Sequence, residues 1–194
     1  MVSVFHADDQ ATPITPEERN ALIPTHVTLR SELNELEQQN IIDAEQWAFA
    51  RKRRLLSESF LRRLHRRMFN RVWRWAGRYR TSEKNIGVAP YLIEVQIREF
   101  LDDAHYWIEH NAYAADEIAV RVHHRLVSIH PFPNGNGRWS RLVADLLIVS
   151  LGSARFTWGQ QNLHAAGDVR ERYIDALHAA DSHDIRPLLA FARS

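Results

Sequence analysis

Hydrophobic residues recur along this chain mostly at the spacing of amphipathic helices. Leu29, Leu33 and Leu36 follow one another at intervals of three and four, which predicts a helix over about 25–39. The same spacing predicts further helices over about 43–69, 94–110, 117–129, 168–180 and 185–192. The stretch 82–93 instead combines β-forming residues with Gly87 and Pro90, which predicts a short hairpin. The pattern therefore indicates an all-α fold, a helical bundle with one small β-hairpin flap.

The stretch from about 136 to 151 is apolar on nearly every side, which predicts a buried helix at the centre of the bundle. Its polar exceptions, Arg138, Arg141 and Asp145, are three and four residues apart and so share one face. Polar groups on a buried helix are costly unless they have partners. A bound phosphate chain would be such a partner, with Asp145 orienting Arg141. The alternative is a purely structural ion pair between Arg141 and Asp145.

The chain has the length of one domain. We expect an irregular N-terminal arm over 1–24, which contains Pro13, Pro16 and Pro24, and a single helical domain over 25–194. Cysteine is absent, which suits a reducing compartment. Neither a bilayer-length apolar run nor the pattern of a signal peptide is evident. These features predict a cytoplasmic protein without a membrane partner.

The charges are unevenly distributed, although the net charge is only +1. Residues 51–80 contain twelve Lys or Arg and one acid, Glu58, whereas residues 1–50 contain nine acids and two basic residues. A basic block can bind nucleic acid or an acidic partner. It can also be a solvated helix face paired with acids such as Glu99, Asp102 and Asp103. We favour the second interpretation, so a nucleic-acid partner is not expected.

The segment His-Pro-Phe-Pro-Asn-Gly-Asn-Gly-Arg-Trp-Ser-Arg over 130–141 has the features of a phosphate site. Gly135 and Gly137 permit close approach of the backbone to a ligand. The N-terminus of the helix that follows favours an anion, and Arg138 and Arg141 add forked cations on one side. His130 lies at the rim, where a general base belongs, although a histidine can also merely cap a helix.

This segment resembles the Fic family signature, His-x-Phe-x-(Asp/Glu)-Gly-Asn-Gly-Arg-x-x-Arg, at every specified position except Asn134. Further resemblance lies at 64–65, 75–80, 83–88 and 184–188, so that it covers roughly residues 55–190. The whole chain is most similar to a Fic subgroup carried on bacterial mobile elements and called mobile mystery protein B.

The resemblance implies an ATP-dependent adenylyltransferase that moves AMP to a Ser, Thr or Tyr hydroxyl of a target protein. It implies that His130 is the base and that Asn136, with the backbone of Gly135 and Gly137, holds the α- and β-phosphates. Arg138 would neutralise developing charge, and Arg141 would grip the γ-phosphate.

The resemblance also assigns roles outside the phosphate loop. Asn134 replaces the carboxylate that holds Mg²⁺ in the family; an amide oxygen can bind Mg²⁺ but carries no charge. Either Mg²⁺ is then held mostly by ATP and water, or the reaction differs from ordinary AMP transfer. Lys84, Asn85 and Ile86 would form the flap that docks the target by strand addition. For Tyr173, a place in the core is slightly favoured, and stacking on adenine is the alternative.

An inhibitory role is implied for the helix over 25–40. Ser31 and Glu35 have the spacing of the family's inhibitory pattern, so Glu35 would pair with Arg141; the alternative is an exposed acidic helix face. A separate regulatory, antitoxin-like protein is the other candidate brake. Two other functions stay open: a divergent Fic-like phosphoryl-type transferase, and a non-catalytic nucleotide-binding or DNA-associated regulator.

Overall fold

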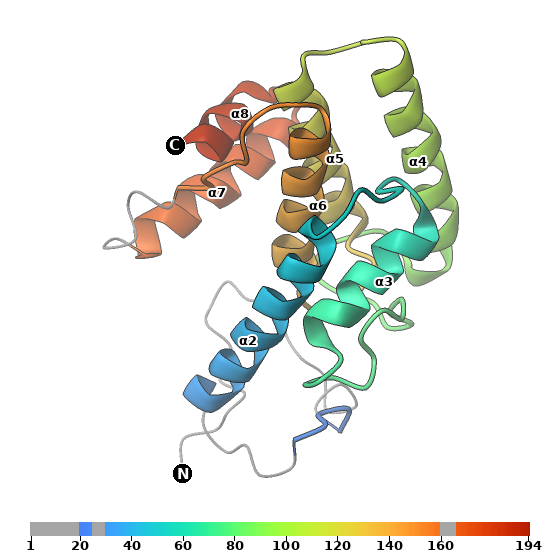
Figure 1. Cartoon of the computed structure of the whole chain (residues 1–194), viewed down its shortest axis with the longest axis vertical. Helices are drawn as coiled ribbons and strands as arrows, with labels where there is room; N and C mark the ends of the chain where they lie inside the picture. The colour runs from blue at the N-terminus through green and yellow to red at the C-terminus, as the bar shows by residue number, and fades with distance from the viewer. Residues whose placement is uncertain (1–19, 25–29, 160–165) are drawn as a thin grey trace.

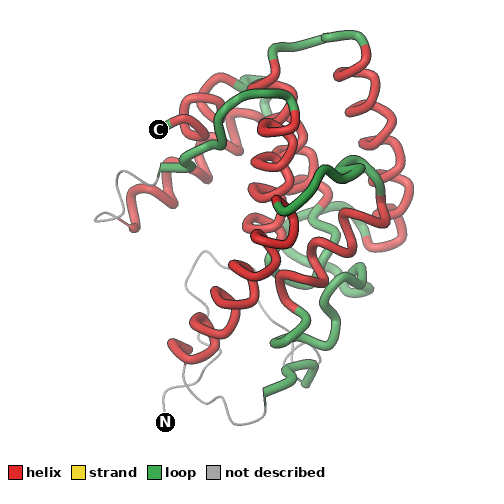
Figure 2. The backbone as a smooth tube through the Cα atoms, in the orientation of Figure 1, coloured by secondary structure: helices red, strands yellow, loops and turns green. Residues whose placement is uncertain are grey.

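The computed structural model describes residues 20–24, 30–159 and 166–194, without the side chains of 30–32 and 166–168. Helices dominate these residues, and Figure 2 shows loops and no strand between them. In chain order the elements are α2 (Arg30–Phe49), α3 (Glu58–Phe69), the 3₁₀ helix η1 (Pro90–Leu92), α4 (Ile93–Glu109), α5 (Ala115–Ile129), α6 (Asn136–Ser150), α7 (Ala166–Asp181) and α8 (Arg186–Arg193). The predicted all-α class is confirmed.

Helices α5 and α6 lie side by side at the centre of the bundle (Figure 1). Helix α6 packs against α2 and α3, whereas α5 packs against α4 and α8. Ten of the fifteen α6 residues are buried, as its apolar sequence predicts. The turn between α5 and α6 therefore lies where the other layers meet.

Aromatic packing ties α6 to its neighbours. The rings of Trp139 and Phe132 are both fully buried and meet edge to face, with centroids 4.9 Å apart. The Trp139 indole N–H also donates a 3.1 Å hydrogen bond to the carbonyl oxygen of Leu61 in α3. Because buried aromatic side chains contribute several kcal/mol each, about 3–5 on truncation, this contact fixes the N-terminal end of α6.

The predicted boundary between the first two helices is wrong. A single helix runs through 40–42 to Phe49, and the chain breaks at 50–57 instead. The Ser57 side chain accepts a 3.3 Å hydrogen bond from the amide of Phe60 and so caps α3. The four consecutive cations at 51–54 precede this cap. The sequence prediction missed the break because it followed the apolar spacing across the cap.

The hairpin predicted over 82–93 is absent. Residues 82–89 form bends without strand pairing, and η1 follows directly. The Arg80 guanidinium takes the place of a partner strand, since it donates hydrogen bonds to the carbonyl oxygens of Ser82 and Val88. This side chain satisfies backbone groups that a hairpin would have paired.

Of the predicted N-terminal arm, residues 1–19 lie outside the described part. Residues 20–24 run beside 72–74: Leu22 forms an isolated bridge with Trp73, and the amide of Arg74 donates a 2.8 Å bond to the carbonyl of Ala21. Within the described residues no helix combines the length and apolar character that crossing a bilayer requires.

The cap of α3 gives a stability prediction. Replacing Ser57 with Ala removes the acceptor for the Phe60 amide and should lower the free energy of unfolding by about 1 kcal/mol. Urea denaturation followed by circular dichroism measures the change. The matched control is Ser59→Ala, an exposed serine two residues further along the chain. Equal losses of stability in both variants would contradict the capping role of Ser57.

Candidate active site

His130 occupies an unusual backbone conformation at the end of α5. Its φ of 52° and ψ of 59° are left-handed, and its amide donates a 3.2 Å hydrogen bond to Leu126. Such angles are uncommon for a residue other than glycine and often mark functional positions. The side chain is 5% exposed. The turn thus holds this imidazole in one place rather than leaving it on the surface.

Arg80 and Gly87 fix the surroundings of His130. The buried Arg80 guanidinium donates a 2.7 Å hydrogen bond to the His130 carbonyl. Gly87, with a φ of 96°, passes so close that a Cβ there would lie 2.5 Å from the Cβ of His130. Sequence reasoning gave Arg80 no role, because its partners are distant carbonyl groups rather than an acid.

The imidazole of His130 is neutral at neutral pH. Burial, together with the nearby charges of Arg80 and Lys84, lowers its pKa to about 4. A neutral imidazole can accept a proton, which a protonated one cannot. The site therefore presents an unprotonated base.

The loop after His130 is clamped by Asn136. Its amide oxygen accepts a 3.0 Å bond from the Phe132 amide, and its Nδ2 donates a 2.8 Å bond to the Phe132 carbonyl. Gly135 is left-handed, with a φ of 79°, and a Cβ there would lie 2.5 Å from the ring of Phe69. The loop leads into α6, and the first backbone N–H groups of α6 point out of its N-terminal end without partners inside the helix. This part of the expected phosphate site is in place, and phosphate contact by the Asn136 side chain stays a prediction.

His65 supports the same loop from α3. Its Nδ1 accepts a 3.0 Å hydrogen bond from the Gly77 amide, so its Nε2 carries the hydrogen and donates to the Asn134 carbonyl at 3.0 Å. Its ring stacks on Phe132 with centroids 3.6 Å apart. Sequence reasoning noted the Leu64-His65 pair but gave His65 no role, since its partners are 12 and 69 residues away.

The side chain of Asn134 contacts its own loop, and a metal contact by it stays a prediction. Its Oδ1 accepts a 2.6 Å hydrogen bond from the amide of Gly135, so the lone amide oxygen is already engaged. Among the described residues no three His, Cys, Asp or Glu side chains gather where they could hold an ion. Since Mg²⁺ prefers carboxylate and phosphate oxygens, this donor set does not fit a protein-held magnesium ion.

Arg138 pairs with an acid of α2 that the sequence interpretation passed over. Glu37 is buried, with one carboxylate oxygen 2.6 Å from Arg138 and the other accepting the Trp73 indole N–H at 2.6 Å. The predicted inhibitory residue, Glu35, is exposed on another side of α2. Within the described residues no ion pair joins Glu35 to Arg141. Helix α2 therefore contacts one of the two motif arginines, Arg138, through Glu37.

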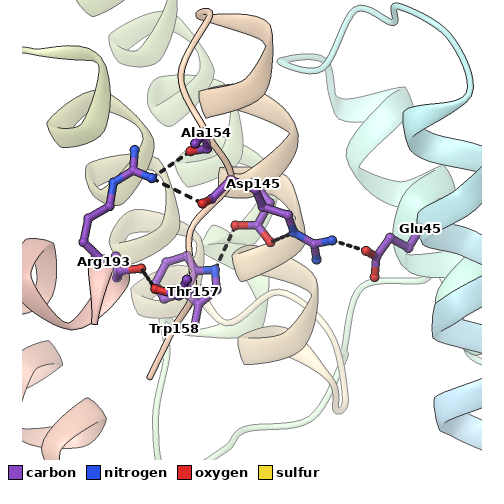
Figure 3. Close-up of polar contacts among 8 residues, drawn as sticks. Glu45, Asp145, Ala154, Thr157, Trp158 and Arg193 are labelled. Atoms are coloured by element: carbon purple, nitrogen blue, oxygen red, sulfur yellow. Dashed lines mark hydrogen bonds and ion pairs between the residues drawn. The ribbon is translucent and has the colours of Figure 1, made fainter. Parts of the chain in front are cut away.

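The expectation that Asp145 orients Arg141 is wrong. Asp145 accepts a 2.7 Å hydrogen bond from Arg155 and a 2.8 Å bond from the indole of Trp158. Arg155 also binds Glu45 of α2, so it bridges α6 and α2 (Figure 3). Arg141 instead lies over the ring of Tyr173, 5.4 Å from its centroid. Asp145 thus anchors the loop after α6 and leaves Arg141 available.

A pocket of about 530 Å³ opens beside these arginines. It lies between α2 and α7, with α6 beneath it, and it is lined by charged, aromatic and aliphatic side chains that include Glu45, Arg138, Arg141, Trp158, Val169 and Tyr173. Its volume lies in the range of small-ligand sites. The hydroxyl of Tyr173 lies 3.1 Å from Nε2 of the buried His123, so this ring is fixed in the pocket wall. The structure therefore brings Arg138, Arg141 and Tyr173 to one cavity, and their contacts with a nucleotide stay a prediction.

The buried His130 precedes the N-terminus of α6, and two arginines of the first turns of α6 line a pocket. Residues 55–148, from the end of the α2–α3 loop to the last turn of α6, match the Fic/DOC family. Curated relatives include protein adenylyltransferase fic-1 of Caenorhabditis briggsae, 30% identical over 60% of this chain and 22% of the relative. Protein adenylyltransferase Fic of Aedes aegypti is 38% identical over 38% of this chain and 13% of its own. The chain thus spans less than a quarter of these relatives.

Solved structures share the fold. Fic-1 from C. elegans superposes with a TM-score of 0.68 at 24% identity, over 91% of this chain and 52% of that one. BepC protein from Bartonella tribocorum, with bound AMPPNP, gives a TM-score of 0.69 at 16% identity, over 92% and 97% of the two chains. The chain therefore contains a segment that matches the Fic/DOC family, in the fold of Fic-domain proteins.

The buried His65 predicts a pH dependence of stability. Burial lowers its pKa to about 3. The unfolded chain, with a histidine pKa of about 6.5, binds this proton first, so the free energy of unfolding falls as pH falls from about 6.5 towards 3. One such histidine contributes about 1.4 kcal/mol per pH unit well below 6.5. In His65→Gln, the slope of this free energy against pH between about 6 and 5 should be smaller by roughly that amount.

Urea denaturation at several pH values measures this slope. The exposed His105→Gln variant keeps His65 and should retain the slope of the wild type. A slope unchanged by His65→Gln would mean that this imidazole is not held neutral by the fold.

Proposed function

We propose that the protein is a Fic-type adenylyltransferase that transfers AMP from ATP to a hydroxyl of a target protein. The observation that supports the proposal is a buried His130 on the short turn that leads into α6, together with the pocket that Arg138 and Arg141 of α6 line. These residues lie within a segment that matches the Fic/DOC family. Relatives named protein adenylyltransferase and a structural neighbour with bound AMPPNP support it.

In this mechanism His130 removes the proton from a Ser, Thr or Tyr hydroxyl of the target. The hydroxyl oxygen attacks the α-phosphorus of ATP, the bond from that phosphorus to the β-phosphate oxygen breaks, and pyrophosphate leaves. The bound triphosphate raises the depressed pKa of His130 and so makes it a stronger base. The backbone of Gly135, Asn136 and Gly137 holds the phosphates, since the Asn136 side chain is bonded to Phe132. Arg138 and Arg141 balance the phosphate charge. Tyr173 packs against the nucleotide from the pocket wall.

Target docking falls to the segment beside His130. Ile86 is 46% exposed, and Lys84 and Asn85 accompany it on the same segment. Because this segment is not a strand, side-chain contacts rather than strand addition would hold the target here. Arg80 and Gly87 keep the segment within reach of the imidazole.

The amide at position 134 supports a second reaction. With no carboxylate to help position a metal between the phosphates, a phosphoryl-type transfer by the same base is the competing outcome. The two reactions differ in the mass that they add to the target. Any Mg²⁺ would be bound by the nucleotide and water, so no step is assigned to it.

We further propose that α2 restrains the enzyme through Glu37. The carboxylate holds Arg138 at 2.6 Å, so that this guanidinium is engaged before nucleotide binds. Trp73 orients the other carboxylate oxygen, which keeps Glu37 in this position. In this proposal Glu37 is the inhibitory residue and Arg138 is its partner. They replace the pair of Glu35 and Arg141 that the sequence predicted. A separate antitoxin-like protein becomes the candidate brake if the restraint fails its test.

Replacing His130 with Ala should lower self-modification by about 10²–10⁴-fold, because the base acts in the chemical step. Intact-mass spectrometry after incubation with ATP measures the modified fraction and distinguishes AMP from phosphate. The exposed His105→Ala variant is the control. If His130→Ala modifies itself as fast as the control, His130 is not the base.

Replacing Glu37 with Gln should raise self-modification about tenfold or more, since hydrogen bonds to charged groups contribute about 1.5–3 kcal/mol. Gln keeps an oxygen for the Trp73 indole and a similar volume, but it removes the negative charge facing Arg138. The matched variant is Glu35→Gln on the same helix, which should behave as wild type. Activation by Glu35→Gln alone would return the restraint to the residue that the sequence favoured.

A further inference from the structure

The outer side of α3 and the segment after it carry arginine almost exclusively. The apolar residues of α3 face the core, which leaves its arginines in solvent. Further exposed arginines follow in the turns at 70–78. We define the arginine face as five residues that line two neighbouring surface hollows: Arg62, Arg63, Arg66, Arg74 and Arg78.

Gly77 brings the two parts of the arginine face together. A Cβ at this position would lie 2.7 Å from the Cβ of Arg66 and 2.8 Å from the Arg62 carbonyl, so glycine allows the turn to rest on α3. The hollows, of about 310 and 260 Å³, share Arg62, Arg66 and Gly77. Tertiary packing thus concentrates positive charge that the sequence distributes over seventeen positions, 62–78.

Little negative charge balances this face. Glu58 lies 3.5 Å from Arg62, with both side chains 44% exposed. Arg63, Arg66 and Arg78 form no ion pair with any residue that the structure describes. The acids expected to neutralise this helix, at 99, 102 and 103 on α4, contribute no ion pair to it within the same residues. The prediction that acids of α4 pair with the arginines of α3 is therefore wrong for the residues that the structure describes.

The residue types of the arginine face favour phosphate groups of a double-stranded nucleic acid over a protein or a single strand. It contains arginine and no lysine, and the planar guanidinium matches phosphate oxygens in a forked geometry. No large apolar side chain is exposed between 55 and 80, whereas protein interfaces centre on apolar and aromatic anchors. No aromatic ring is exposed there either, and single-stranded nucleic acid needs such rings for stacking.

We propose that the arginine face binds the phosphate backbone of double-stranded DNA without reading its sequence. The shallow hollows admit phosphate groups, and the contacts are those of backbone positioning rather than base readout. The face shares no residue with the 530 Å³ pocket, so this binding does not depend on the proposed transferase activity.

The test is fluorescence anisotropy of a labelled 30-base-pair duplex titrated with the full chain at several salt concentrations. Three phosphate contacts would weaken binding about 40-fold between 50 and 200 mM salt. The triple variant Arg63→Ala, Arg66→Ala and Arg78→Ala should weaken this binding and reduce the slope of log Kd against log salt by about 2.7. Among the residues that the structure describes, these three side chains make no hydrogen bond or ion pair, so their loss should leave the fold intact.

A control with the same change of charge is Arg98→Ala, Arg172→Ala and Arg186→Ala, all exposed on other helices. It should keep the affinity of the wild type, and circular dichroism should give the same helix content for both triple variants. The proposal is overturned if the duplex does not bind at 50 mM salt, or if the two variants weaken binding equally. Equal affinity for poly-glutamate or for a single strand of the same charge would also overturn it.

Discussion

The hydrogen bonds between Asn136 and Phe132 are the interaction on which the rest of the site depends. Two helices meet at a short turn, and within that turn one buried side chain satisfies both polar groups of one residue. Phe132 is thereby held in the core against Trp139 and His65. Since buried polar groups without partners are costly, the turn has few alternative conformations. The left-handed His130 lies immediately before this clamp, and α6 begins immediately after Gly135.

Support for the turn comes from side chains that use backbone carbonyl groups as partners. His65 reaches Asn134 from α3, and Arg80 reaches His130 from the chain before the flap segment. Both are buried, and neither pairs with a carboxylate through these contacts. The Arg80 guanidinium and the neutral His65 imidazole therefore hold the loop without bringing a negative charge near it. This arrangement leaves the region near the α6 N-terminus favourable for an anion.

Helix α2 contacts both the start of α6 and the segment that follows α6. Glu37 pairs with Arg138 near the start of α6, and Glu45 pairs with Arg155 two turns further along α2. The eight-residue separation places the two acids on similar sides of the helix. Both arginines also line the 530 Å³ pocket, so these two ion pairs join α2 to the pocket wall. The arginine face on the outside of α3 is separate from this linkage.

The helical class and the buried central helix could be predicted from the amino-acid sequence, as could the motif at 130–141 that joins a turn to the start of α6. These follow from local spacing, because apolar periodicity and the glycine positions act over a few residues. Only the tertiary structure decided that Glu37 rather than Glu35 meets an arginine, that Asp145 binds Arg155 rather than Arg141, and that Arg80 replaces a hairpin. Neighbouring acids two positions apart on a helix point in different directions, and which one faces inward depends on how α2 rotates against α6 and Trp73. That rotation is set by packing between segments far apart in the chain, which local spacing does not specify.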